Sequence, residues 1–531
     1  MDILKIKNDI ANSNTALGIE FGSTRIKAVL VNSDNVPIAT GSHTWENRLE
    51  NGIWTYTETD IITGMQDCYS SLVKEIETKY GIIPVSYGSI GISAMMHGYM
   101  AFDENDTLLV PFRTWRNTMT EKASEQLTEL FGFSIPQRWS IAHLYQCILG
   151  NETHLKSLAH LTTLAGYIHY RLTGNRVLGV GEASGMFPVD SQTLTYNADM
   201  VKKFDTTAIS LGFDKPLLSL LPSVLTAGKN AGTLTESGAK LLDVSGNLRA
   251  NIPLCPPEGD AGTGMVATNS VAVRTGNVSA GTSVFAMVVL EKPLKKLHRQ
   301  IDMVTTPSGE AVAMVHCNNC TSELNAWAEL FAEFTRSAGF DIDMGDIYEL
   351  LFKKALDGKK DCDGMIAYNY LSGEHVTGFE QGRPLFARRP DTALNLADFV
   401  RTQLYTALGA LKTGLDILTK EENVPIDSIT GHGGFFKTEK VGQSILAAAV
   451  NAPVSVMSTA GEGGAWGMAL LASYMNNKNG LTLEKWLAEN VFASVEKNVI
   501  APDPEDVAGF DRFMKAYTAC LAIERSAIDI L

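Results

Sequence analysis

Apolar residues alternate with short polar turns at the beginning of the chain. The stretch 16–31, ALGIEFGSTRIKAVLV, predicts an apolar strand, a polar turn at 22–24 and a second apolar strand. A third strand is expected at 36–40. Residues 58–80 then change to helical spacing, with apolar side chains three or four positions apart, and predict an amphipathic helix. The chain therefore begins with three strands followed by a helix.

The first half of the chain continues this mixture of strands and helices. Residues 87–93 predict a buried strand that ends at a polar cluster containing Met96, His97 and Gly98. Because strand ends face the ligand crevice in open α/β sheets, this cluster is a candidate binding site. Three further helices are predicted, over 119–131, 141–150 and 153–172.

The second half repeats the same order of elements. Residues 255–289 predict a Gly-rich turn, a short helix and an apolar hairpin that bends at 281–283. Two more Gly-rich turns are each followed by a helical pattern, at 430–437 and 461–467. A chain of 531 residues is too long for one core. We therefore expect two α/β domains, residues 1–260 and 261–531.

Composition and charge exclude several classes of protein. With 45% hydrophobic and 19% charged residues the chain is globular, and its net charge of -15 argues against nucleic-acid and anionic-membrane partners. No apolar run reaches the roughly 18 residues of a membrane span, and the amino terminus lacks a signal-peptide pattern. We expect a cytoplasmic protein with a small-molecule partner, and a homodimer is left open.

The cysteines do not form a disulfide pattern. There are seven, scattered from Cys68 to Cys520, which fits a reducing compartment. Cys317 and Cys320 form a CxxC motif, but a zinc site would need a second ligand pair that the sequence does not offer. A structural role for these two cysteines is therefore favoured.

Two hairpin turns are candidates for phosphate binding, because backbone N–H groups and hydroxyls in such turns can surround phosphate oxygens. They consist of Gly22, Ser23 and Thr24 and of Gly281, Thr282 and Ser283. Glycine is favoured at many turns, so either turn alone also fits a purely structural role. Neither matches a P-loop or a GxGxxG fingerprint. Two such turns, one per domain, suit a nucleotide polyphosphate.

The ordered blocks of the chain resemble the FGGY family of carbohydrate kinases over nearly its whole length. The blocks are GISAMMHGYMAFD, PEGDAGTGM, VRTGNVSAGTSVFA, ITGHGGFFKT and AGEGGAWGMALLA. The resemblance implies two ribonuclease-H-like (actin-like ATPase) domains flanking a central cleft, with ATP and Mg²⁺ as cofactors. It implies that the protein phosphorylates a sugar, and D-xylulose and ribulose rank first among the expected substrates. The alternative substrates are L-fuculose, L-rhamnulose, gluconate and glycerol. The alternative to a kinase is a non-catalytic actin-like nucleotide-binding scaffold.

The resemblance also implies roles for individual residues. Asp260 aligns with the family's catalytic carboxylate, which accepts the proton of the attacking hydroxyl. Sugar contacts are implied for Met96, His97, Gly98, Arg113, Trp115, Glu182 and Asp260. ATP contacts are implied for the two hairpin turns and for Gly433, Gly434, Phe435, Gly463 and Gly464. Without the family, Asp260 would be read as a turn former, His97 as structural and Glu182 as a solvated loop charge.

Three positions depart from the family pattern. Glu20 stands where the first phosphate motif normally begins with Asp, and its longer side chain would reach Mg²⁺ through a water molecule. Asn117 stands where many relatives carry Asp, which bears on the identity of the sugar. His143 stands where many relatives carry Lys.

Overall fold

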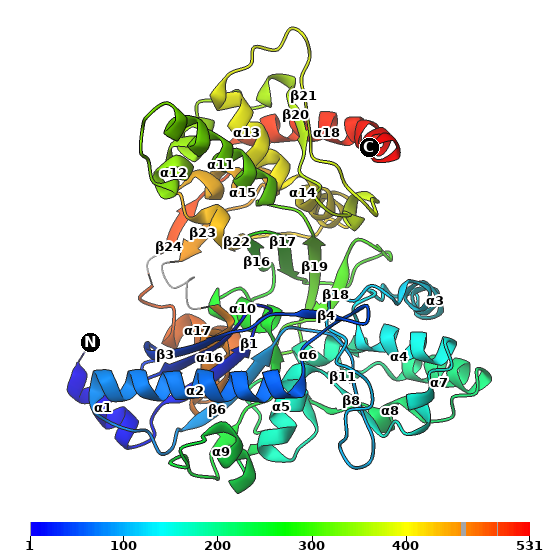
Figure 1. Cartoon of the computed structure of the whole chain (residues 1–531), viewed down its shortest axis with the longest axis vertical. Coiled ribbons are helices and arrows are strands. Elements are labelled where there is room, and N and C mark those ends of the chain that lie inside the picture. Colours follow the sequence, from blue (N-terminus) through cyan, green and yellow to red (C-terminus); the bar gives the residue numbers. More distant parts are fainter. Residues whose placement is uncertain (1, 458–462, 496) are drawn as a thin grey trace. The chain divides into compact units, whose positions relative to one another are not determined.

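The computed structural model describes residues 2–457, 463–495 and 497–531 (Figure 1). The chain forms two compact units, each built from separate stretches of sequence. The first comprises Met1–Val271, Met303–Val312 and Glu462–Ser494, and the second comprises Ala272–Asp302, Ala313–Gly461 and Val495–Leu531. The predicted division at residue 260 therefore lies close to one of the boundaries and misses the others.

A mixed sheet is the centre of the first unit. Its strand order is β13-β14-β6-β1-β2-β3, and β15 also pairs with β6. The strands are β1 (Ala16–Phe21), β2 (Arg25–Val31), β3 (Pro37–Thr44), β6 (Ser89–Ala94), β13 (Gly232–Thr233), β14 (Pro253–Leu254) and β15 (Glu258–Gly259). Strand β1 pairs antiparallel with β2 and parallel with β6. The hairpin predicted at 16–31 is thus confirmed, and the predicted strand at 87–93 lies beside it.

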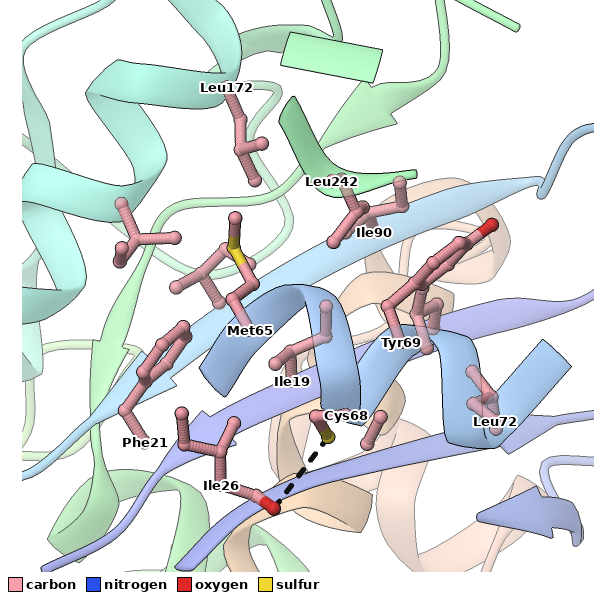
Figure 2. Packing of buried hydrophobic residues seen from close by; sticks show 14 of the residues in the cluster. Ile19, Phe21, Ile26, Met65, Cys68, Tyr69, Leu72, Ile90, Leu172 and Leu242 are labelled. Atoms are coloured by element: carbon pink, nitrogen blue, oxygen red, sulfur yellow. Dashed lines mark hydrogen bonds between the residues drawn. The ribbon is translucent and has the colours of Figure 1, made fainter. Parts of the chain in front are cut away.

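Helix α2 (Glu58–Tyr80) covers one face of this sheet and has the predicted bounds. Thr57 begins it with a capping box, and Gly81 ends it at a φ of 69°. Figure 2 shows the fully buried contact between the strands and the helix, which involves Ile19, Phe21, Ile26, Met65, Cys68 and Tyr69. The Cys68 thiol also donates to the Ile26 carbonyl at 3.6 Å.

Helix α16 (Gly463–Asn477) covers the other face, toward which alternate residues of β1 point. It approaches β1 so closely that a Cβ at Gly18 would lie 2.2 Å from the Ala465 carbonyl oxygen. The Ser89 hydroxyl on β6 donates to the Ala472 carbonyl at 2.8 Å. This packing is why residues from near the end of the chain belong to the first unit.

A second sheet, with strand order β18-β19-β17-β16-β22-β23-β24, repeats this arrangement, and its strands β16, β17, β22, β23 and β24 belong to the second unit, whereas residues 303–305 of β18 are grouped with the first. The strands are β16 (Thr275–Ala280), β17 (Val284–Val289), β18 (Asp302–Thr305), β19 (Ala311–Cys317), β22 (Ser428–His432), β23 (Val454–Met457) and β24 (Lys497–Ile500). Strand β16 pairs antiparallel with β17 and parallel with β22, as β1 does with β2 and β6. The predicted hairpin at the start of a second, related domain is confirmed.

Helices pack around the second sheet. They are α11 (Ser322–Ser337), α12 (Met344–Ala355), α13 (Leu396–Ala407), α14 (Gly409–Asp416), α15 (Val441–Val450) and α18 (Pro504–Ile530). Within the described ranges, the chain has no helix with the length and apolar character needed to cross a membrane. All seven cysteines are unpaired, and Cys317 and Cys320 are buried.

One predicted helix is wrong. In place of a helix over 153–172 the structure has a 3₁₀ turn (Thr153–Lys156), strand β8 (His160–Thr162) and helix α5 (Leu164–Thr173). Strand β8 pairs antiparallel with β7 (Met100–Phe102), and the His160 ring stacks on Phe102 with centroids 5.1 Å apart. Pairing with a strand distant in the sequence overrides local helical spacing here. The two preceding helices, α3 (Glu121–Phe131) and α4 (Ser140–Leu149), agree with the prediction.

Candidate active site

The carboxyl ends of three parallel strands bring acidic side chains together in the first unit. Strand β6 pairs with β1 on one side and β15 on the other, so that Glu20, Ser93 and Glu258 stand side by side. Asp260 follows β15 directly and begins helix α10 (Asp260–Ala267). The Met96 N–H donates to the Asp260 carboxylate at 3.4 Å. Blocks that are far apart in the sequence therefore meet at one edge of the sheet.

Asp260 has the properties of a proton acceptor. Its carboxylate also accepts a 2.8 Å hydrogen bond from the Ala261 N–H, which fixes its orientation. Burial raises the pKa of Asp260 to about 6, while hydrogen bonds from the backbone act against this rise. The group is thus ionised at neutral pH and close to the pKa at which a general base is efficient.

Glu20 lies at the end of β1 against the beginning of helix α16. The Ala465 N–H donates to its Oε2 at 3.1 Å. A Cβ at residue 464 would lie 2.2 Å from Glu20 Oε1, so the longer carboxylate fits because this residue is glycine. Burial, and secondly the charge of Asp260, raises the pKa of Glu20 to about 7. Two half-buried carboxylates form an oxygen donor set that suits Mg²⁺.

Glu182 and Glu258 form a second acidic pair beside Asp260. Glu182 lies in the short helix α6 (Val180–Ser184), and Glu258 accepts the N–H groups of Glu182 at 2.9 Å and Gly181 at 3.4 Å. The alternative that Glu182 is a solvated loop charge is wrong, because the side chain is fully buried. Burial raises the pKa of Glu182 well above its usual value and that of Glu258 to about 8.

The Glu182 carboxyl group is available to a ligand. Neither of its oxygens has a hydrogen-bond partner in the described part of the chain, and the nearby Thr163 hydroxyl offsets the rise in pKa only in part. Buried polar atoms in native proteins are almost always hydrogen-bonded. Hydroxyl groups of a bound sugar would supply the missing donors.

His97 holds an unusual backbone conformation at the end of β6, with a φ of +70°. Its Nδ1 lies 2.9 Å from the Gly185 carbonyl oxygen, and its ring stacks on Trp139. Burial lowers the pKa of His97 to about 3, so the imidazole is neutral. With the Nδ1 proton donated to the carbonyl, Nε2 is an acceptor. Gly98 follows at a φ of +84°, where a Cβ would lie 2.8 Å from the Arg113 carbonyl oxygen.

The side chain of Arg113 is engaged within the protein. It is buried, and its guanidinium pairs with Glu152 at 2.6 Å and lies 3.1 Å from Cys147 Sγ. Cys147, Glu152 and His154 offer ligand atoms within 4.8 Å of one another, but the guanidinium already supplies the cation at this cluster. His143 is fully buried nearby, and burial lowers its pKa to about 3.

The two other residues of interest on this loop link separate elements. Trp115 Nε1 donates to the Ser23 hydroxyl at 3.1 Å, which joins the predicted sugar segment to the first hairpin turn. The Asn117 side chain accepts from the Trp54 N–H at 2.9 Å and donates to the Trp54 carbonyl at 2.8 Å. Aspartate could not donate the second bond, so asparagine at this position has a structural reason.

Both predicted phosphate turns have backbone donors to offer. In the described part of the chain, no intramolecular acceptor is recorded for the N–H groups of Ser23 and Thr24, or for those of Thr282 and Ser283. The second turn is held by hydrogen bonds from the residue 320 and 321 N–H groups to its carbonyls. Such clusters of free N–H groups are anion-binding features.

A cavity of about 1150 Å³ lies in the second unit between α11, α12 and the turn at 434–441. Gly434 and Phe435 line it, as the sequence predicts for the adenosine pocket. Gly433 adopts a φ of +102°, and a Cβ there would lie 2.4 Å from the Ala280 carbonyl oxygen.

The last two glycines of the predicted ATP site belong to the first unit. Gly463 and Gly464 begin α16, and neither is among the described residues that line the cavity. Gly464 faces Glu20 instead. Residues 461 and 462 of the predicted turn lie outside the described residues. The sequence did not predict a role for Glu258, although it lies two positions before Asp260 in the block PEGDAGTGM.

Comparisons with known proteins agree with this architecture. Models of the FGGY family of carbohydrate kinases match residues 15–266 with the N-terminal domain and residues 276–475 with the C-terminal domain. A xylulose kinase from Haemophilus influenzae is 20% identical over 520 residues, which cover 95% of this chain and 99% of that protein.

Solved structures share the fold at low identity. A ligand-bound xylulose kinase from Lactobacillus acidophilus matches with a TM-score of 0.77 and 17% identity, over 96% of this chain and 99% of that chain. A gluconate kinase from the same species matches with a TM-score of 0.77 and 18% identity, over 96% of this chain and 98% of that chain. The predicted actin-like ATPase fold is confirmed, and the fold does not distinguish these two sugars.

Proposed function

The chain belongs to the FGGY family of carbohydrate kinases, and from this premise we propose that it transfers phosphate from ATP to a hydroxyl of a ketopentose, D-xylulose or ribulose. The observation that carries the proposal is the cluster of buried and half-buried carboxyl groups around Asp260 at the ends of β1, β6 and β15. Membership in a kinase family argues against the alternative of a non-catalytic scaffold.

Asp260 is the general base of the proposed reaction. It accepts the proton of the sugar hydroxyl while that oxygen attacks the phosphorus of ATP, and the bond to the leaving ADP breaks. Its support is the pKa of about 6 and the orientation set by the Met96 and Ala261 N–H groups. Phosphoryl transfer needs little more than such a base, positioning and charge neutralisation.

The sugar is bound by residues of the first unit in this proposal. His97 Nε2 and the unpartnered Glu182 oxygens accept hydrogen bonds from its hydroxyl groups. Met96 forms an apolar wall beside them, and the backbone at Gly98 lets the sugar approach closely. Trp115 belongs to the same binding segment, whereas Arg113 acts through its buried pair with Glu152.

ATP is the phosphate donor that the family implies. We assign its phosphate oxygens to the free N–H groups of the two hairpin turns and its adenosine portion to the cavity beside Gly433, Gly434 and Phe435. Glu20 would hold Mg²⁺ through water, and the ion would neutralise charge on the phosphates. Gly464 makes room for the Glu20 carboxylate.

The choice of a ketopentose is supported by the xylulose kinases among the similar proteins. Because a gluconate kinase has an equal TM-score, other sugars of the family are alternative outcomes. The enzyme is proposed to work in the cytoplasm, where ATP is available and its seven free cysteines stay reduced.

The test is sugar-stimulated ADP release from the full-length protein with Mg²⁺. D-xylulose, D-ribulose, L-ribulose, L-fuculose, L-rhamnulose, gluconate and glycerol are compared by kcat/KM. We expect a ketopentose to give the highest value. Preference for gluconate or glycerol would reject the substrate, and folded protein without any sugar-stimulated release would reject the kinase.

A further inference from the structure

A smaller cavity of about 340 Å³ lies in the first unit, and none of the proposed catalytic, sugar or ATP residues line it. Its walls come from β7, β8, α5 and the segment that follows α5. The side chains that matter below are Phe102, Asp106, His160, Tyr170, Arg171 and Arg176. The volume is within the range of about 300–1000 Å³ that is usual for small-molecule sites.

Two arginines give this cavity a surplus of positive charge. Arg176 pairs with Asp106 at 2.6 Å, and Asp106 is the acidic residue among those that line the cavity. Arg171 donates to the Tyr167 hydroxyl at 2.5 Å, and this hydroxyl in turn donates to Glu58 at 2.7 Å. Each guanidinium therefore keeps donors for which the described part of the chain records no acceptor. Both arginines are exposed and can be reached by a ligand.

His160 adds an independent indication of a ligand. Its side chain lines the cavity and is buried, with 8% of the side chain exposed. Its Nε2 lies 3.3 Å from Asp106, but its Nδ1 has no hydrogen-bond partner in the described part of the chain. A buried polar atom without a partner is destabilising, so it indicates an interaction that the protein alone does not provide.

We propose that this cavity binds a small phosphate monoester of a polyhydroxy compound. A phosphate monoester carries a charge of about -1.5 to -2 at neutral pH, which matches two arginines opposed by one lining carboxylate. The planar guanidinium fork fits phosphate oxygens in a bidentate manner. The hydroxyls of Thr162, Thr235 and Ser237 also line the cavity and can pair with the hydroxyls of such a ligand.

Calorimetric titration of the full-length protein with D-ribulose 5-phosphate tests this proposal. Orthophosphate, gluconate and neutral D-ribulose serve as phosphate-only, carboxylate and uncharged probes. We expect the sugar phosphate to bind, and Arg171→Gln with Arg176→Gln to weaken that binding at least tenfold. Arg299→Gln changes an exposed arginine outside the cavity and is the matched control. Binding should survive Glu182→Ala, which alters the proposed sugar site instead.

The single variant Arg171→Gln tests whether weaker binding is caused by misfolding, because it leaves the Arg176–Asp106 pair intact. It should weaken binding while the thermal melt stays that of the wild type. Equal affinity in the wild type and both arginine variants would overturn the proposal. So would arginine-dependent binding of gluconate without binding of the sugar phosphate. Binding of orthophosphate as tightly as the sugar phosphate would overturn the polyhydroxy part.

Discussion

Asp260 combines a raised pKa with a fixed orientation, and its proposed role can be tested by a change that keeps its shape. Asp260→Asn removes the proton acceptor and retains an oxygen for the Met96 and Ala261 N–H groups. Because a positioned base contributes about 10²- to 10⁴-fold, roughly 3 to 5 kcal/mol, kcat should fall by that factor. Nucleotide affinity, measured by calorimetry, should persist. A folded variant with more than about a tenth of wild-type kcat would exclude this role.

Glu258 makes the stability of the protein depend on pH. Burial raises its pKa from 4.5 in the unfolded chain to about 8 in the folded protein. Between these values the folded state keeps a proton that the unfolded state has lost, so this contribution to stability is complete below pH 4.5 and is lost as pH rises through 8. Glu258→Gln mimics the protonated form and should remove the loss.

The measurement is the free energy of unfolding by denaturant at pH 5 and pH 9, with EDTA present. The difference in the free energy of unfolding, variant minus wild type, should be larger at pH 9 than at pH 5 by an amount on the order of a few kcal/mol. Buried His97 and His143, with pKa values of about 3, act in the opposite direction below pH 6.5 and are common to both proteins. A difference between the proteins that is independent of pH would contradict the prediction.

Individual residues could be predicted where they belong to a sequence motif. They could not be predicted where contacts with distant parts of the chain determine their environment. The blocks around Asp260, His97 and Glu20 pointed to the strand ends at which these residues lie. The acidic partner Glu258 was missed, because its burial depends on the Gly181 and Glu182 N–H groups from another part of the chain. Likewise, Asn117 looked like a change in substrate contact, and its two bonds to the Trp54 backbone appear only in three dimensions.

At the scale of elements, the contact of α16 with β1 requires glycine at residue 18. A Cβ in Gly18→Ala would lie 2.2 Å from the Ala465 oxygen and 2.3 Å from the Ala469 nitrogen, both backbone atoms that cannot rotate away. Overpacking of this kind costs about 1–3 kcal/mol and sometimes more. Chemical denaturation should show that loss, together with reduced turnover, since the Ala465 N–H binds Glu20.

The matched control for this variant is Gly150→Ala. Its Cβ would have its nearest neighbour at 3.4 Å, at the end of α4, so its stability should stay within about 0.5 kcal/mol of the wild type. Equal stability of Gly18→Ala and Gly150→Ala would show that α16 can move away from β1 without cost.

Element prediction succeeded where the pattern of apolar residues was local. Helix α2 has one apolar face and a capping box at its start, and both its bounds were predicted. Residues 153–172 have helical spacing too, but pairing of β8 with β7 and the stacking of His160 on Phe102 interrupt it. Helix α16 is buried along residues 464–475, so its sequence does not show which sheet it covers.

The whole molecule consists of two units with related sheets, and this much was predictable from the repeat of a hairpin, a Gly-rich turn and a helix. The division of the chain between the units was not. Residues 303–312 and 462–494 return to the first unit, and nothing local to either segment distinguishes it from its neighbours. Dividing the chain at one point in the sequence assumes that each domain is a continuous segment. A helix can pack against a sheet that is distant in the sequence, so this assumption fails here.

This division predicts that residues 1–271 alone do not form a native first unit. Without α16 the face of the sheet that includes Gly18 and Gly91 is exposed, and the Ser89 hydroxyl loses its acceptor. We expect this fragment to bind the dye ANS and to lack native near-UV circular dichroism, as in states that lose specific packing. Fusion of residues 463–494 through a flexible Gly/Ser linker should reduce dye binding and restore a cooperative thermal transition. The control carries the same residues in scrambled order. Cooperative unfolding of 1–271 by itself, or equal rescue by the scrambled segment, would show that α16 is not needed to complete the first unit.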